Sequence, residues 1–166
     1  MPSTYEPIAT RTADGSTAFF DFSSIPQIYT DLILVIGGST GDSAPFIRLN
    51  SDTSKIYSST RLRGDGSSSS SGRRVRADGS PNDTRLEVGL GSSNEIVTNT
   101  FHLMNYTSTT TNKTVLCRAN QASSAVHFSV GLYGSNSAIN AIRVGNTNSN
   151  ALSSGTVISI YGIKAA

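Results

Sequence analysis

The chain has 166 residues, of which 14% are charged, and its formal net charge is only +2 at pH 7. Such weak charge disfavours a protein that binds the phosphate backbone of nucleic acids. The single cysteine, Cys117, excludes an intrachain disulfide and any cysteine-based zinc site, and its place in an apolar run predicts a small buried side chain.

Four small or polar residue types, Ser, Thr, Asn and Gly, supply 73 of the 166 residues. They separate short runs rich in β-branched and aromatic residues that recur about every ten to fifteen residues. This rhythm is typical of strands joined by polar turns, and no segment has a helical period. We therefore predict an all-β chain, an antiparallel β-sandwich of about nine to eleven strands with jelly-roll topology, in one domain spanning residues 1–166.

The predicted strands follow in chain order. Asp31–Ile36 is apolar at every position after Asp31, which favours a central strand buried on both faces. In Val126–Tyr133 the apolar residues fall at every second position, which predicts that they share the core face while His127 lies on a solvated or interface face. The other predicted strands are Ile8–Arg11, Thr17–Phe22, Pro45–Leu49, Tyr57–Arg63, Arg85–Leu90, Ile96–Tyr106, Lys113–Ala119, Ala138–Val144 and Ser154–Ile163.

The N-terminal sequence shows no basic segment followed by an apolar stretch, so we expect no signal peptide. The longest apolar run, Leu32–Ile36, is far shorter than the ~20 residues of a membrane-spanning helix. We therefore expect the chain to fold in a cytoplasm and to make no membrane contact.

From Gly64 to Asn82 the chain loses nearly all apolar residues, and it includes five consecutive serines, Ser67–Ser71. This composition predicts a long exposed loop at about residues 64–82, and long loops are often functional. Basic residues gather in and beside it, and they form the candidate protein or glycan contact site: Arg61, Arg63, Arg73, Arg74, Arg76 and Arg85.

Four interpretations of this arginine cluster stay open. It can be a solvated loop with local ion pairs, a protein contact surface, or a site for an anionic glycan. The fourth, a nucleic-acid site, is disfavoured because few aromatic residues interleave with the arginines.

Catalytic candidates are weak. The two histidines, His102 and His127, both lie in predicted strands, and serine is too abundant to indicate a triad. The Gly41–Ser43 segment matches the start of a lipase-type block, but a strand follows it where a helix is needed. Many acidic residues lie in Asp-Gly turns, and no carboxylate pair for glycoside cleavage stands out. We expect no enzyme, no cofactor and no metal; polysaccharide turnover that depends on Glu87 or Glu95 would change that expectation.

Several blocks stand out together: Tyr5–Thr10, Phe22–Leu32, Leu49–Thr53 with Tyr57 and Ser58, Asn105–Thr107 with Lys113 and Thr114, and Gly155–Lys164. In this order and at this spacing, they resemble a widespread group of small virion proteins of tailed bacteriophages, common among phages of aquatic bacteria. The similarity runs nearly end to end.

The resemblance implies a non-enzymatic structural protein located in the virion after assembly in the host cytoplasm, and it carries over no catalytic residues. The first hypothesis is a capsid decoration (cement) protein, a homotrimer that bridges major capsid subunits. The alternative is a tail-fibre or tail-tip module that binds a host surface glycan, with candidate exposed tyrosines at Tyr57, Tyr106, Tyr133 and Tyr161. Brevity of the chain favours the first hypothesis.

Overall fold

The computed structural model describes residues 4–41, 43–75, 84–87, 89–92, 95–121 and 123–164. These residues form twelve strands and no α-helix. The strands are β1 (Tyr5–Thr12), β2 (Phe19–Phe22), β3 (Asp31–Gly38), β4 (Pro45–Leu49), β5 (Tyr57–Gly64), β6 (Ser69–Arg74), β7 (Leu86–Glu87), β8 (Val97–Met104), β9 (Lys113–Gln121), β10 (Ala125–Tyr133), β11 (Ile142–Asn146) and β12 (Val157–Ile163).

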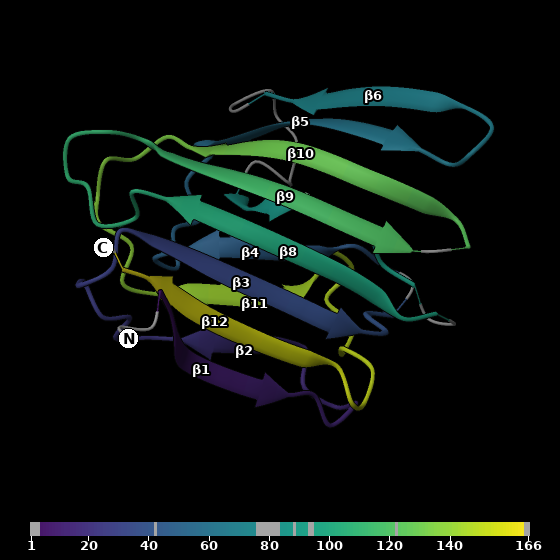
Figure 1. Cartoon of the computed structure of the whole chain (residues 1–166), viewed down its shortest axis with the longest axis horizontal. Helices are drawn as coiled ribbons and strands as arrows, with labels where there is room; N and C mark the ends of the chain where they lie inside the picture. The colour runs from purple at the N-terminus through teal and green to yellow at the C-terminus, as the bar shows by residue number, and fades with distance from the viewer. Residues whose placement is uncertain are drawn as a thin grey trace.

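The strands build two antiparallel sheets that pack face to face. The larger sheet has eight strands in the order β1-β12-β3-β8-β9-β10-β5-β6, and the smaller has four in the order β2-β11-β4-β7. Figure 1 shows the smaller sheet behind the larger one, with the β5–β6 hairpin extending past it at one edge. The predicted β-sandwich is confirmed, and the strand order is consistent with a jelly roll.

The core lies between the sheets because alternate residues of each strand point inward. In β3 the inward residues Leu32, Leu34 and Ile36 are fully buried, and Phe101 lies opposite Leu34 on β8. We call this side of the eight-stranded sheet the inner face, and the side that points away from the smaller sheet the outer face. The outward residues of β3 are only half-buried. The prediction that this strand is buried on both faces is therefore correct for the inner face and wrong for the outer face.

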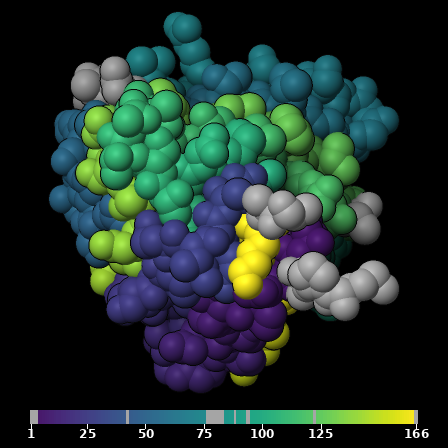
Figure 2. All heavy atoms as spheres, turned by 60° about the vertical axis from the view of Figure 1, so that its left-hand side comes forward, coloured from purple at the N-terminus to yellow at the C-terminus, as the bar shows by residue number. Residues whose placement is uncertain are grey.

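Loops from distant parts of the chain close one end of the sandwich. The Tyr106 hydroxyl after β8 donates a hydrogen bond to the Pro26 carbonyl, and the Ile139 N–H donates to the Tyr106 carbonyl. Figure 2 shows this end, where the teal-green loop after β8 lies against blue and lime segments. Tyr106 therefore serves the fold and is fully buried.

The predicted exposed tyrosines are mostly buried. Tyr57, Tyr106 and Tyr133 are at most 2% exposed, and only Tyr161 is partly open. The Tyr133 hydroxyl donates to the Asp52 carboxylate at 2.9 Å, and burial raises the pKa of Tyr133 to about 12. A phenol fits a β-sandwich core when its hydroxyl finds a partner, so composition does not separate core tyrosines from surface ones.

The predicted loop at about residues 64–82 is wrong in its first half. Ser69–Arg74 form strand β6, which pairs with β5 across a tight turn. Asp65 accepts backbone hydrogen bonds from Ser67 and Ser68, and Gly66 has a φ of +88°. The Asp-Gly pair therefore makes a hairpin turn, as its local chemistry predicts. The rest of the predicted loop from residue 76, with Arg76, lies outside the described residues.

The inward and outward faces of strand β10 are the reverse of the prediction. His127, Ser129 and Gly131 face inward, while Val126 and Phe128 face outward and are 63% and 50% exposed. The reason is close approach of the segment around β7: a Cβ on Gly131 would lie 2.8 Å from the Leu86 side chain. From Ala125 to Gly131 the inward residues are all small or polar, so the apolar residues of this stretch point to the outer face.

A test of the packing is available at Gly162 of β12. A Cβ there would collide with the ring of the buried Tyr29, whereas a Cβ at Gly37 of β3 would meet nothing within 4 Å. We expect Gly162→Ala to lower the free energy of unfolding by about 1–3 kcal/mol, because overpacking forces neighbours to shift. Gly37→Ala should change it by less than about 0.5 kcal/mol. Urea unfolding of both variants checks this, and equal effects would contradict the close packing of Tyr29 on Gly162.

Candidate functional site

The structure distributes the predicted arginine cluster over several surfaces. Arg61, Arg63 and Arg74 lie on the inner side of β5 and β6, because they share rows with inward residues of β10. Arg73 lies on the outer face. Arg76 is outside the described residues, and Arg85 precedes β7 in the other sheet. The cluster is therefore not one patch, and its contact with a partner stays a prediction.

Two of these arginines hold the fold together. Glu87 of β7 forms ion pairs with Arg74 at 2.5 Å and with Arg85 at 2.7 Å, and its side chain is only 7% exposed. The Arg85 guanidinium also lies 4.6 Å from the centre of the Phe46 ring. The Arg74–Glu87 pair connects the hairpin of one sheet to the edge strand of the other, and the Arg85–Glu87 pair is local to the segment of β7.

The histidines lie on opposite faces. His127 is 5% exposed, and its Nδ1 lies 3.2 Å from the Gly89 carbonyl, so the proton is on Nδ1. Burial lowers its pKa, and Arg61 and Arg63 add to this effect. The predicted solvated or interface position of His127 is therefore wrong.

His102 lies on the outer face of β8. Its Nε2 is 2.7 Å from the Asp31 carboxylate, whose other oxygen accepts the Asn105 N–H. Both side chains are partly exposed, so the pair is available at the surface.

The outer face carries an apolar surface that was not predicted from the sequence. One row runs across five strands from Val35 through Thr100, Arg118 and Phe128 to Leu62. Four of the flanking outward residues are also apolar, Ile33, Leu116, Val126 and Val130, and the others include Thr60, Thr98, His102 and Asn120. Phe128 and Leu62 are 50% and 60% exposed, which is unusual for large apolar side chains gathered on one sheet.

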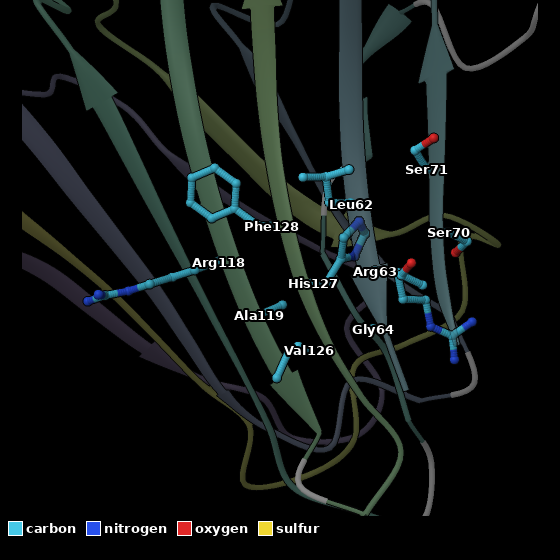
Figure 3. Close-up of a pocket in the computed structure, with 11 residues that line it drawn as sticks. Leu62, Arg63, Gly64, Ser70, Ser71, Arg118, Ala119, Val126, His127 and Phe128 are labelled. Carbon is cyan, nitrogen blue, oxygen red and sulfur yellow. The ribbon is translucent and has the colours of Figure 1, made fainter. Parts of the chain in front are cut away.

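A hollow of about 780 Å³ opens where this surface meets the β5–β6 hairpin. Its lining combines apolar side chains of Leu62, Val126 and Phe128 with Arg118 and the serines of β6. Figure 3 shows Val126, Phe128 and Arg118 extending to one side of the sheet, and His127 and Arg63 to the other. The hollow therefore belongs mainly to the outer face.

Arg118 occupies a central position on the outer face. It also lines two smaller hollows of about 250 Å³, one with Tyr5 and His102 and the other with Thr98 and Asn120. The guanidinium is exposed, and it has no hydrogen bond or ion pair within the described part of the chain. The outer face around Arg118 is the candidate functional site.

One sequence signal could have found this face. Outward as well as inward positions of β3 are apolar, so the sheet needs cover on both sides, and only one side has it. Arg118 itself gave no signal, because a lone arginine in a strand is common.

Cys117 is fully buried on the inner face, as predicted, and burial raises the pKa of its thiol to about 12. Within the described ranges, no group of three or more His, Cys, Asp and Glu residues is placed to hold a metal ion. No helix among the described residues has the length and apolar character needed to span a membrane.

No protein-family model matches the chain, and no curated protein matches it in sequence. Among solved structures it is similar to alginate lyase Aly36B, with 6% identity, a TM-score of 0.39, and coverage of 94% of this chain and 79% of the lyase. It is also similar to domains LG4-5 of the mouse laminin alpha1 chain, with 13% identity, a TM-score of 0.36, and coverage of 91% of this chain and 40% of the laminin chain. A human SPRY domain shares 9% identity and a TM-score of 0.32, with coverage of 96% and 97%. These distant likenesses assign no function.

The ion pairs at Glu87 give a direct stability test. Glu87→Gln leaves Arg74 and Arg85 without their carboxylate in a mostly buried site, so we expect a loss of about 3 kcal/mol in the free energy of unfolding. The control is Asp21→Asn, which breaks the more exposed pair with Arg143 and should cost about 1 kcal/mol or less. Chemical denaturation measures both, and a smaller loss for Glu87→Gln than for Asp21→Asn would contradict the assignment.

Proposed function

We propose that the chain is a non-enzymatic structural protein of a tailed-phage virion, a capsid decoration protein that docks its outer face onto major capsid subunits. The observation that carries the proposal is the exposed apolar surface around Phe128, Leu62 and Val126. Large contiguous apolar patches on soluble proteins mark interaction sites. The sequence resemblance supplies the kind of particle.

Decoration would stabilise the shell by mass action. A protein that binds only the assembled shell lowers the free energy of that state, by about 2.7 kcal/mol per site when its free concentration is 100 times Kd. Shell lattices repeat with local symmetry, which favours a homotrimer at a three-fold position. The polar and thinly charged remainder of the surface suits a protein held close to many copies of itself.

A second candidate is a tail-fibre or tail-tip module that binds a host glycan. The favouring observation is the hollow at Phe128, where a half-exposed aromatic ring lies near Arg118 and the hydroxyls of Ser69 and Ser71. Aromatic rings stack on sugars, and hydroxyl groups hydrogen-bond to them. This function needs only a few copies, at the tail.

Copy number and position in purified particles test the proposal. We expect about one copy per capsid subunit, spread over the head by gold labelling. Particles assembled without the protein should lose their genome at a lower temperature, and adding the purified protein should restore the original temperature.

A few copies confined to the tail would contradict decoration and support the glycan module. Absence of the protein from particles would contradict both virion roles. The control measures binding of the protein to unassembled capsomers of the same particle. A decoration protein should bind these capsomers more weakly than it binds the assembled shell.

A further inference from the structure

The outer face carries an excess of positive charge. Its outward strand residues include two arginines, Arg73 and Arg118, neither of which has an ion pair within the described residues. The acidic residue among these outward positions is Asp31, and it is already paired with His102. A partner that covers this face must therefore bring negative charge to balance it.

The size of the face fits a protein partner. Eight strands spaced about 4.8 Å apart, with about seven paired residues each at about 3.3 Å per residue, give a sheet face of roughly 38 by 23 Å. That footprint of about 870 Å² is large enough for the ~800 Å² per partner of a standard stable interface. A short glycan would cover only part of it.

A second copy of this chain fits the face poorly. Two such faces packed centre to centre would bring Arg118 of one copy close to Arg118 of the other, because β9 lies near the middle of the sheet. The only outward strand carboxylate among the described residues, Asp31, is engaged by His102 and by the Asn105 N–H. Like charges placed together in an interface weaken binding.

Arg118 has the surroundings of an interface anchor. It lies directly opposite Phe128 on one neighbouring strand and Thr100 on the other, with Leu62 beyond Phe128. Its apolar neighbours are Phe128 and Leu116, and Thr100 and Asn120 border its other side. An arginine in such a place loses water when a partner covers it, and central residues of this kind contribute most of the binding free energy. Its planar fork then needs a carboxylate that accepts two hydrogen bonds.

We propose that the outer face binds a heterologous protein surface that presents a carboxylate within an apolar patch, and that this carboxylate pairs with Arg118. This inference rests on the proposed function, in which the partner surface belongs to the capsid shell. It specifies the chemistry of that surface: an Asp or Glu side chain surrounded by apolar residues. Arg73, at the edge of the face, adds attraction that is screened by salt.

The test uses empty shells of the phage that carries the gene, assembled without this protein. Binding of the purified wild type, Arg118→Glu and Arg118→Lys is measured by co-sedimentation. We expect Arg118→Glu to raise Kd by about 30-fold or more, as at interface hot spots. Arg118→Lys should give a smaller loss, because lysine keeps the charge and loses the fork. The matched control is Lys55→Glu, the same charge reversal on an exposed loop, which should change Kd less than about 2-fold.

Each other outcome overturns the inference in a distinct way. If the wild type binds shells and Arg118→Glu binds equally well, the proposed function stands and the anchor is wrong. If the wild type does not bind shells, the proposed function fails and the inference fails with it. If sedimentation of the free protein shows self-association that Arg118→Glu abolishes, the occupant is a second copy. Unchanged circular dichroism and unfolding midpoint of the variants exclude misfolding as the cause.

Discussion

The close crossing of residues 84–87 and 89–92 beneath the eight-stranded sheet constrains the rest of the structure. Asn99 of β8 holds this segment by bonding both the N–H and the carbonyl of Leu90, and His127 contacts the Gly89 carbonyl. Gly131 leaves room for the Leu86 side chain. Because side chains alternate along a strand, small and polar residues on this side of β10 place its apolar residues on the other side. The apolar outer face thus follows from a packing requirement inside the sandwich.

The unequal size of the two sheets has a second consequence. Four strands cannot cover eight, so the β5–β6 hairpin extends past the smaller sheet and is held there by the pairing of Arg74 with Glu87. The hairpin pairs with β10 through β5, and Leu62 and the serines of β6 complete the hollow beside Phe128. The arginines near the predicted loop thus contribute in two ways: Arg74 and Arg85 stabilise the sandwich, and Arg73 adds charge to the outer face.

Most strand positions and the fold class could be predicted because alternation and turn chemistry are local signals, although the predicted Arg85–Leu90 corresponds to a strand of only Leu86–Glu87, and the predicted Ala138–Val144 overlaps β11 only from Ile142. Pro45–Leu49 has the same bounds in the prediction and in the structure, and the Asp65 turn follows from its own hydrogen bonds. Strand β6 could not be predicted, because its serines and arginines have low strand propensity and only pairing with β5 fixes them. Which face of β10 is buried could not be predicted either. The apolar residues of this strand share one face, but only the crossing segment decides that the opposite face is the buried one. The candidate site combines Arg118, Phe128 and Leu62 from three strands, and the register that joins them cannot be predicted from any one strand.

The central claim is that a partner covers the outer face in the assembled particle. The most direct measurement is the rate of thiol labelling at Val126→Cys, in the free protein and in purified particles. The native Cys117 does not interfere because it is fully buried and its pKa is about 12, and Ser137→Cys on an exposed loop controls for access of the reagent to the particle surface. The account predicts fast labelling at residue 126 in the free protein and strong protection in the particle, with fast labelling at residue 137 in both states. Equal labelling of residue 126 in both states would contradict it.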